Sequence, residues 1–520
     1  MSNSRQRPGL ARAAALVMAA FAVSRLLGLV RQVVYGAYFG IGPEMDAYVA
    51  AKNIPETIFL VVAGGALGSA FIPLFTGRLA KGETASAWRL ASAIITILFA
   101  VLVPLSLIGI VVAPWLVRVV VAPGLARAVQ ARTVEVMRVM LLSPTIFGIS
   151  GIVMGALNAH RHFLLPALAP VVYNLALIAG GIVGGLTPLG AMGPAISMVV
   201  GAVGHLLIQV PWLLRRRVPL RPTLGRGDPG VVEVGRLLVP RAFGMAVGQL
   251  NVLIAGNLAS RLGTSAISAL DTAWRVMLLP QGIFAQAVGV AVFPTFSEQA
   301  ALGETAELRS TLSDALRLLI VLTIPATVGL VLVGQPVVAL LFQRGAFNAE
   351  ATGAVAPALS FYALGLVGLS ALEVLGRAFY ALHDTWTPVL ATVGGVALNA
   401  GLGLWLPNVF ARAGWPPLGG LALATAVSAL VESAVLFVLA RRRLGSLDGA
   451  AILATTVRVV GASVAMGVAL RAFRVIGPEG ALVQSLVGVP LGVAVYVALA
   501  WILGVDELRV IARVVLKRVG

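Results

Sequence analysis

Long apolar segments recur along the whole of this 520-residue chain, and each is about 20 residues or longer. A helix of that length spans the hydrocarbon core of a bilayer, where backbone polar groups are satisfied only within helices or closed barrels. The apolar runs are continuous and do not alternate with period two, which disfavours a barrel. Since one helix and its connection take roughly 35 residues, the sequence predicts about 14 transmembrane helices.

The composition supports this interpretation, because only 11% of the residues are charged and 59% are hydrophobic. Soluble proteins carry about 25% charged residues, so an ordinary water-soluble enzyme is excluded. Pro and Gly mark many ends of the apolar segments. We predict spans at residues 10–39, 46–76, 88–112, 132–155, 163–186, 190–214, 232–261, 266–297, 310–333, 350–380, 386–406, 417–440, 452–473 and 481–504.

Basic residues outnumber acidic residues by 38 to 20, for a net charge of +18. In so apolar a chain this excess favours basic cytoplasmic loops over nucleic-acid binding. Large clusters such as Arg215–Arg217 and Arg441–Arg443 fall on one side, and an even number of spans returns the C-terminus to the side of the N-terminus. We therefore predict a multi-pass protein of the cytoplasmic (inner) membrane with both termini in the cytoplasm. The loop around Arg118, Arg127 and Arg132 runs against this orientation.

The C-terminal tail carries basic residues at every fourth position, with Val and Ile between them: Arg509, Arg513 and Lys517. This spacing predicts a basic amphipathic helix that binds the anionic lipids of the inner leaflet.

The chain also repeats itself across a polar linker at residues 215–230. Asp46 and Pro55 lie nine residues apart, as do Asp271 and Pro280, at an offset of 225. Further matches pair residues 71–75 with 292–296, 81–83 with 302–304, and 160–166 with 382–388. Six spans in each half give both repeats one orientation, which is typical of two bundles related by an axis along the membrane normal.

The repeat predicts three parts: an N-terminal six-helix lobe (1–222), a C-terminal six-helix lobe (223–445), and two additional transmembrane helices with the basic amphipathic tail (446–520). In transporters built this way the substrate binds between the bundles, and one bundle rocks against the other.

Ionisable residues inside the spans are the strongest functional signal. Arg25 and Arg31 share the first span, about 120° apart around the helix and roughly 9 Å apart along it, with Gly28 between them. Arginine at the bilayer centre costs about 2.5–3.5 kcal/mol, so these side chains are expected to line a hydrated cavity. Arg275 lies in the second half, four residues after Asp271 and on the same helix face.

The arginines favour an anionic headgroup, because the planar guanidinium donates two parallel hydrogen bonds to phosphate. Asp46, Lys52 and Glu56, early in the second span, are possible partners. The alternative is that these side chains snorkel or form structural pairs. Gly28 lets the helix bend or lets it pack closely.

Other polar residues in the spans leave two interpretations open. In one interpretation, three asparagines ligate a cation or cap a broken helix; in the other, they make ordinary interhelical hydrogen bonds. These are Asn251, Asn257 and Asn399. Two glutamates, Glu373 and Glu432, are interpreted either as proton carriers or as partners of an ion pair or hydrogen bond, with Arg377 or with a residue of another span.

The sequence lacks the motifs of several other activities. No Gly-rich phosphate loop followed by Lys and Ser or Thr is present, which disfavours an ATP-driven pump. Four His and no Cys leave no metal-ligand cluster, and no loop is large enough for a catalytic domain. We therefore expect a transporter rather than an enzyme, without cofactors, coupled to Na⁺, H⁺ or the membrane potential.

Several runs of the sequence resemble the MurJ (MviN-type) lipid II flippases, over roughly residues 10–440. The resemblance rests on Ser24–Arg31 followed by Phe39-Gly40 and Asp46-Ala47, on Arg275 to Pro280 with Gly282, on Phe342–Phe347, and on Phe379 to Pro388. These flippases belong to the multidrug/oligosaccharidyl-lipid/polysaccharide exporter superfamily. The resemblance implies two six-helix lobes and two added helices that form a groove for a polyprenyl tail.

By this resemblance the chain flips lipid II, the undecaprenyl-pyrophosphate-linked peptidoglycan precursor, or a related glycolipid, to the outer leaflet by alternating access. The substrate-binding candidates are Arg25, Arg31, Arg275, Asp46 and Lys52. The conformational or ion-coupling candidates are Gly28, Glu56, Asp271, Asn251 and Asn399.

The sequence departs from the family at several positions of the second span. Phe59 and Leu60 replace an arginine pair, Gly64 replaces a glutamate, and Lys52 is displaced by about one position. These departures leave open an exporter of another polyprenyl-linked oligosaccharide or of a drug. A membrane-embedded glycosyltransferase and a scaffold without transport are two further possibilities from different functional classes.

Overall fold

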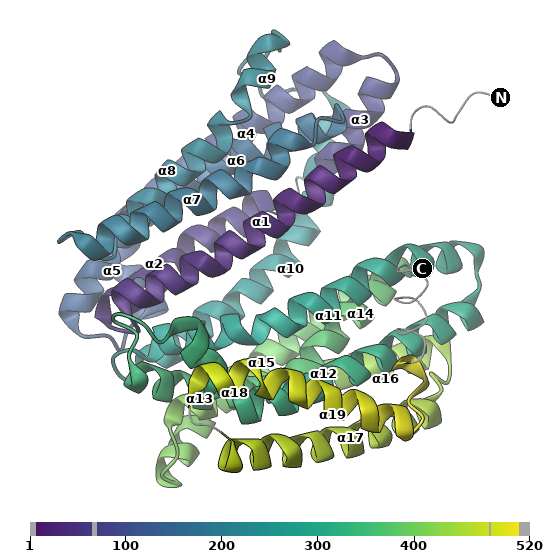
Figure 1. Cartoon of the computed structure of the whole chain (residues 1–520). Coiled ribbons are helices and arrows are strands. Elements are labelled where there is room, and N and C mark those ends of the chain that lie inside the picture. Colours follow the sequence, from purple (N-terminus) through teal and green to yellow (C-terminus); the bar gives the residue numbers. More distant parts are fainter. Residues whose placement is uncertain (1–6, 65–69, 478–479, 509–520) are drawn as a thin grey trace. The chain divides into compact units, whose positions relative to one another are not determined.

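The computed structural model describes residues 7–64, 70–477 and 480–508 (Figure 1). All regular secondary structure in these ranges is helical, mostly α with short π segments. The chain forms two compact units, Met1–Ile267 with Arg344–Phe347, and Ser268–Gln343 with Asn348–Gly520. The predicted tail helix at 509–520 lies outside the described residues.

The helices of the first unit follow the chain from α1 to the end of α10 at Ser260. They are α1 (Arg7–Phe39), α2 (Pro43–Phe59), η1 (Leu60–Gly64), α3 (Ile72–Ala80), α4 (Thr84–Trp115), η3 (Leu116–Val121), α5 (Arg127–Met140), α6 (Ser143–Ala159), α7 (Leu164–Leu186), α8 (Met192–Leu207), α9 (Val210–Arg215) and α10 (Pro229–Ser260).

The helices of the second unit include the longest in the described chain. They are α11 (Ala266–Leu302), α12 (Thr305–Phe342), α13 (Ala349–Leu364), α14 (Leu366–Ala381), α15 (Trp386–Arg412), α16 (Pro417–Leu444), α17 (Gly449–Ile476), α18 (Ala481–Leu486) and α19 (Gly488–Ile502).

Twelve helices among the described residues are long and apolar enough to cross a membrane. The pair α13–α14, bent by 46°, raises this number to 13 if it forms one span. The remaining predicted span, 46–76, contains α2, η1 and α3 on either side of residues 65–69, which lie outside the description. The prediction of an all-helical polytopic membrane protein is confirmed.

Two π-helices of the described chain, η1 and η3, each follow a proline. Pro55 lies inside α2, and η1 begins five residues later; Pro114 lies inside α4, and η3 begins two residues later. Proline removes a backbone donor, and π segments are common where a helix adjusts to such a loss. Asn257 of α10 donates to the carbonyls of Val119 and Val120 in η3, at 3.2 and 2.8 Å. The Asn257 side chain thus donates hydrogen bonds to backbone carbonyls that, in a regular α-helix, accept them from backbone amides of the same helix.

An aromatic cluster forms part of the core of the first unit. Phe75 contacts Trp88 edge to face at 5.2 Å, and His160 stacks on Trp88 at 5.7 Å. His160 follows α6, outside the spans, and its ring also lies 5.0 Å from that of Trp212. Burial, and then the charge of Arg216, lower the pKa of His160. This histidine therefore packs as a neutral ring.

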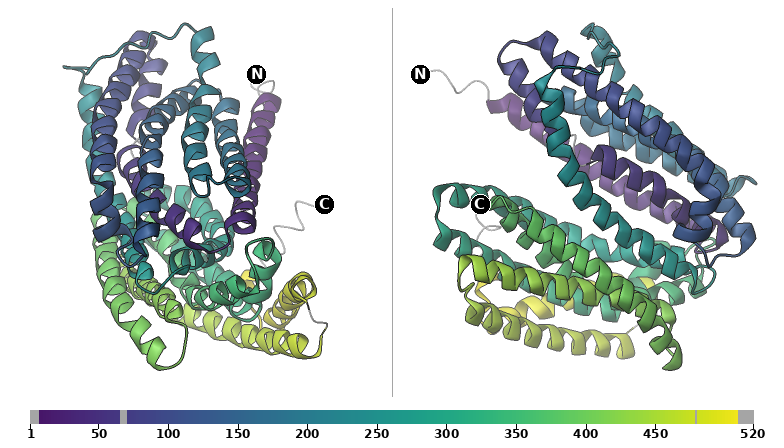
Figure 2. Two further views of the ribbon diagram at one scale, coloured as in Figure 1. Left: turned by 90° about the vertical axis from the view of Figure 1, so that its left-hand side faces the viewer. Right: turned by 180° about the vertical axis from the view of Figure 1, so that it is seen from behind.

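The two additional helices pack onto the second unit through α12. α17 and α19, yellow-green and yellow, lie side by side (Figures 1 and 2). Val459 and Met466 of α17 share a buried cluster with Val321 of α12 and Tyr496 of α19. The Tyr496 hydroxyl donates to the Val321 carbonyl at 2.6 Å. This cluster and hydrogen bond hold the appended helices to the lobe.

Glycines let neighbouring helices approach closely in both units. A methyl group on Gly368 of α14 would lie 2.8 Å from the backbone of Ala429 in α16, and one on Gly193 of α8 would lie 2.6 Å from Gly184 in α7. Between membrane helices the driving force is close packing rather than the hydrophobic effect, and small residues permit it.

Matching turns confirm the parallel repeat. Arg161 and His383, 222 residues apart, are both non-glycine residues with positive φ, at 59° and 58°. Gly82 and Gly303 have φ of 78° and 73° at an offset of 221. Left-handed backbone is uncommon for residues other than glycine, so its recurrence at the predicted offset reflects the same turn in both halves.

Helix α10 belongs to one lobe by sequence and to another by packing. The repeat assigns it to the second half of the chain, within 223–445. In the structure it packs against α2, α4, η1 and η3 of the first compact unit.

An ion pair fastens the polar linker to the first unit. Arg78 of α3 donates to both carboxylate oxygens of Asp228, through Nη1 at 2.8 Å and through Nη2, and also to the Ser86 carbonyl. Asp228 is the N-cap of α10 and accepts from the Gly230 amide at 2.8 Å. The hydrogen bond from Arg78 is the main reason why the pKa of Asp228 lies below its ordinary value.

We expect Asp228→Ala to lower the free energy of unfolding by about 1–2 kcal/mol, because it removes both the ion pair and the helix cap. Asp228→Asn should lose less, since asparagine also caps helices well. The lowered pKa means that the ionised form stabilises the fold above the ordinary aspartate pKa, and that this contribution disappears as the pH falls through the lowered value. Thermal unfolding of the three proteins in detergent across an acidic pH series measures both effects. Equal unfolding temperatures for all three would contradict the prediction.

Candidate functional site

The predicted site residues fall in both compact units. The first unit holds Arg25, Gly28 and Arg31 on α1, Asp46, Lys52 and Glu56 on α2, and Asn251 on α10; the second holds Asp271 and Arg275 on α11 and Asn399 on α15.

Arg31 lies half-buried on α1, one helical turn before Tyr35. Its Nε atom is buried and has no hydrogen-bond partner among the described residues. A buried donor left without a partner costs about 1–3 kcal/mol, and a bound acceptor would remove that cost. Its position therefore fits a ligand that accepts hydrogen bonds.

Tyr35 of α1, Tyr48 of α2 and Tyr173 of α7, here called the tyrosine cluster, lie close to one another, and two of them lie near this arginine. The charge of Arg31 acts on the hydroxyls of Tyr35 and Tyr173. Tyr35 and Tyr48 contact edge to face at 5.3 Å, and the Tyr35 hydroxyl donates to the Leu177 carbonyl at 3.2 Å. This cluster was not predicted from the sequence, although the i,i+4 spacing of Arg31 and Tyr35 is a signal that the two share a face.

Arg25 and Gly28 face open space on α1. Arg25 is exposed, and a methyl group on Gly28 would meet no atom within 4 Å. Helix α1 nevertheless runs unbroken through Gly28. The two interpretations of Gly28 are helix bending and close packing. In the described structure no neighbouring atom packs against this glycine.

Asp46 is fully buried near the start of α2. Its carboxylate accepts a hydrogen bond from the backbone amide of Ser265 at 2.6 Å. Ser265 has a φ of 72°, an unfavourable conformation for serine that a strong hydrogen bond helps to hold. Asp46 thus fixes the turn that leads into α11.

The second half of α2 carries one buried cation and one exposed acid. Lys52 is 5% exposed, whereas Glu56 is exposed and acts electrostatically on Tyr173. Phe59, which the family resemblance marks as a departure from an arginine, contacts Phe147 at 5.4 Å. Phe147 in turn contacts Tyr173 at 4.9 Å, so aromatic packing replaces charge at this point.

A buried polar chain in the first unit was also missed. Ser150 of α6 bonds to Nδ1 of His205 in α8 at 2.7 Å, and Gln209 donates to Ser150 at 2.8 Å. A histidine within an apolar span is the signal that points to such a network. The network joins α6 to the end of α8.

The short segment Arg344–Phe347 also belongs to the first unit. The amide of Ala346 donates to the Ala37 carbonyl at 2.7 Å, and Gly345 has a φ of 58°. A methyl group on Gly345 would overlap the Ala37 carbonyl, so the close approach requires glycine here. This explains the glycine of the Phe342–Phe347 motif.

In the second unit the predicted pair on α11 forms. Arg275 donates through Nε to Asp271 at 2.6 Å and through Nη2 at 3.3 Å. Both side chains are partly buried. A two-pronged pair holds the guanidinium plane in a fixed orientation.

A second pair of this kind lies on α14. Arg377 donates through Nη2 to Glu373 at 2.5 Å and to Gln286 of α11 at 3.4 Å. Of the two interpretations of Glu373, the structure shows the ion pair with Arg377.

The amide candidates lie on different helices. Asn399 is buried and accepts a hydrogen bond from the Thr425 hydroxyl of α16 at 3.4 Å. Asn251 is half-buried on α10. Among the described residues no three His, Cys, Asp or Glu side chains come together as a metal site.

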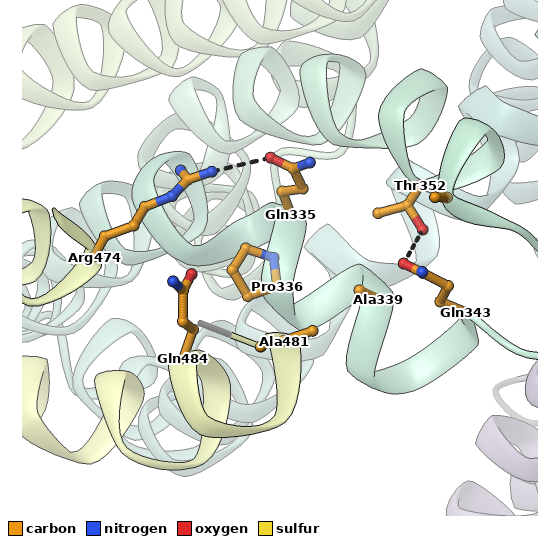
Figure 3. Close-up of a pocket in the computed structure, with 10 residues that line it drawn as sticks. Gln335, Pro336, Ala339, Gln343, Thr352, Arg474, Ala481 and Gln484 are labelled. Carbon is orange, nitrogen blue, oxygen red and sulfur yellow. Dashed lines mark hydrogen bonds between the residues drawn. The ribbon is translucent and has the colours of Figure 1, made fainter. Parts of the chain in front are cut away.

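A pocket of about 210 Å³ lies in the second unit where α12, α13, α17 and α18 meet (Figure 3). Arg474 donates to Gln335 across it at 3.1 Å, and Thr352 donates to Gln343 at 3.1 Å. None of the sequence-predicted site residues lines this pocket.

Residues 35–490 match the family model described as lipid II flippase MurJ. A lipid II flippase MurJ of Burkholderia cenocepacia is 32% identical over 434 residues, covering 81% of this chain and 82% of the relative. A probable lipid II flippase MurJ of Thermotoga maritima is 29% identical over 490 residues, covering 94% and 96%.

Solved structures agree on the fold. A lipid II flippase MurJ in an inward closed conformation matches with a TM-score of 0.78 at 23% identity, covering 95% of this chain and 99% of that one. An inward-facing multidrug resistance MATE family transporter of the MOP superfamily matches with a TM-score of 0.69 at 16% identity, covering 83% and 99%. At these identities the likeness shows a shared transporter fold.

We expect Asp46→Ala to destabilise the protein by about 1.5–3 kcal/mol, because a buried hydrogen bond to a charged group is lost. Asp46→Asn should be milder, since the amide oxygen still accepts from Ser265. Ser265→Gly should be tolerated, because glycine adopts positive φ without strain. Thermal unfolding of the purified variants measures these differences. Equal stability of the Ala and Asn variants would argue against this role of the Ser265 hydrogen bond.

Proposed function

This chain belongs to the lipid II flippase MurJ family, and from that membership we propose that it moves lipid II from the inner to the outer leaflet of the cytoplasmic membrane by alternating access. The single observation that carries the proposal is the buried Nε of Arg31, which lacks a partner in the described chain. The pyrophosphate of the substrate supplies the acceptor oxygens that this donor needs.

Energetics favour an anion beside Arg31. A guanidinium at bilayer depth costs about 2.5–3.5 kcal/mol, and the stable solutions are an acidic partner, water or a charged ligand. Arg31 has no ion pair among the described residues, whereas Arg275 and Arg377 each have one. We assign Arg31 as the primary phosphate-binding residue. Arg25 and Lys52 of the same unit are proposed to contribute to this headgroup site, whereas Asp46 is buried and serves the turn at Ser265. Arg275, in the second unit, is proposed as a further phosphate-binding residue.

The two appended helices fit the lipid part of such a substrate. α17 and α19 expose valines to their surroundings, among them Val464 at 59%, Val468 at 65% and Val493 at 56%. An apolar helix surface suits a polyprenyl chain. We propose that the tail lies along these helices.

The aromatic packing of Phe59 favours a second candidate substrate. With Phe59 and Leu60 in place of an arginine pair, the first lobe carries fewer cations than in many relatives. A related polyprenyl-pyrophosphate glycolipid with a less acidic headgroup would fit this surface. Either substrate makes the protein a transporter, and the proposal assigns no catalytic residue and no cofactor.

The proposed orientation places both termini in the cytoplasm, on the side of the basic clusters. The basic tail after residue 505 would then meet the anionic lipids of the inner leaflet, and no role for nucleic acid is proposed. Because the sequence has no nucleotide-binding loop, we propose coupling to an ion gradient or the membrane potential.

Replacement of a conditional lipid II flippase by this chain tests the proposal. We expect the wild type to restore growth, Arg31→Ala to abolish rescue, and Arg31→Lys to rescue weakly, because lysine keeps the charge but loses the planar fork. Arg442→Ala, which removes an exposed arginine at the end of α16, is the control and should rescue fully. Immunoblots of membranes establish equal abundance. A wild type that inserts without rescue, or rescue by Arg31→Ala, would overturn the proposal.

A double substitution separates binding from ion pairing at Arg275. If Arg275 binds substrate, Arg275→Ala and the double variant Asp271→Ala/Arg275→Ala should both lose flipping. If the arginine serves only to neutralise Asp271, the double variant should recover what the single variant loses, since no unpaired charge remains. Rescue of growth, with membrane abundance as the control, distinguishes the two outcomes.

A further inference from the structure

A carboxyl group without a cationic partner in the described part of the chain lies between α15 and α16 of the second unit. Glu432 of α16 is half-buried, and its Oε1 lies 2.7 Å from the hydroxyl of Thr392 on α15. Gly395, one turn after Thr392, makes room for it, because a methyl group there would overlap Glu432 Oε2. Neighbouring residues Val431 and Val435 are 43% and 44% exposed, so this helix face borders the apolar surroundings.

The hydrogen-bonding capacity of Thr392 decides the protonation state. Its oxygen also lies 3.0 Å from the Pro388 carbonyl, which is an acceptor only. A threonine hydroxyl has one hydrogen and can donate to one of these neighbours. If Glu432 were ionised, Thr392 would face two acceptors with a single hydrogen. If Glu432 is protonated, it donates to Thr392, Thr392 donates to Pro388, and both hydrogen bonds form.

Among the described residues, no charged side chain compensates an ionised Glu432. Helix α16 packs against α12, α13, α14 and α15. None of the ionisable side chains of these helices makes a hydrogen bond or ion pair with Glu432 in the described structure: Glu307, Arg309, Asp314 and Arg317 on α12, Glu350 and Tyr362 on α13, Glu373, Arg377 and Tyr380 on α14, Arg412 on α15, and Arg441–Arg443 on α16 itself. A carboxylate in apolar surroundings with one hydrogen bond is costly, and the neutral acid avoids that cost.

We propose that Glu432 is a proton-binding site of the C-terminal lobe, protonated at neutral pH and hydrogen-bonded to Thr392. On release the carboxylic acid becomes a carboxylate and one H⁺ leaves to water. The Thr392 hydrogen then turns from the Pro388 carbonyl of its own helix to Glu432 Oε1 on the neighbouring helix. Proton release thereby removes the hydrogen bond within α15 and converts the neutral hydrogen bond between α15 and α16 into a charge-assisted one, which is stronger. Such an exchange couples the proton to the packing of two spans.

Infrared spectroscopy of the full chain in lipid bilayers tests proton binding directly. At neutral pH we expect a carbonyl stretch of a protonated carboxylic acid that shifts in D₂O and disappears in Glu432→Gln. The matched control is Glu373→Gln, which removes a glutamate of α14 in the same unit and should leave the band in place, since Glu373 is ion-paired. Thr392→Val should keep the band but move it to higher frequency, because the acid loses its acceptor.

The proposal fails if the wild type shows no such band at neutral pH, or if the band persists in Glu432→Gln. It also fails if Thr392→Val leaves the band unmoved. Should Glu432→Gln not fold, the Thr392→Val shift decides the assignment by itself.

A role in transport rests on the proposed flippase function and has its own readout. In the growth-rescue assay we expect Glu432→Gln, a mimic of the protonated acid, to abolish the dependence of rescue on external pH. Unchanged pH dependence in this variant would show that the proton does not drive transport. Failure of the wild type to rescue would count against the flippase function and leave the infrared result standing.

Discussion

A polar group at bilayer depth has no water to bind, and the rest of this structure depends on that constraint. Two arginines, Arg275 and Arg377, satisfy this constraint by forming ion pairs with an acidic residue one helical turn away. Asn257 meets it by donating to carbonyls of a π-helix. In the described chain Arg31 Nε lacks a hydrogen-bond partner and the Glu432 carboxyl, bonded to Thr392, lacks a cationic one. These are the groups to which we assign a diphosphate and a proton.

The two lobes share their backbone turns and differ in their chemistry. Arg161 and His383 take the same left-handed conformation at equivalent positions. In the first lobe Arg31 lies among tyrosines, whereas in the second lobe Arg275 is paired with an acid. The repeated fold therefore carries different side chains at its two arginines, so one fold holds distinct sites.

The sequence predicted what depends on local pattern. The spans follow from hydropathy, the repeat from constant offsets, and the Asp271–Arg275 pair from i,i+4 spacing. It could not predict the bond from Asp46 to Ser265, because 219 residues separate the two and only the packed chain joins them. It also assigned α10 by its place in the repeat, although a repeat reports duplication and says nothing about which neighbours a helix contacts.

The energy available to one proton limits what Glu432 can do alone. A membrane potential of 100 mV and a pH difference of one unit together supply about 3.7 kcal/mol per proton, a bias of a few hundredfold. Reversing a two-state equilibrium from 1:99 to 99:1 takes about 5.5 kcal/mol. One proton therefore falls short of a complete switch, and the remainder has to come from the substrate. An anionic headgroup that binds Arg31 more strongly in one conformation than in the other supplies this remaining free energy. The proton and the lipid therefore act on the same conformational equilibrium.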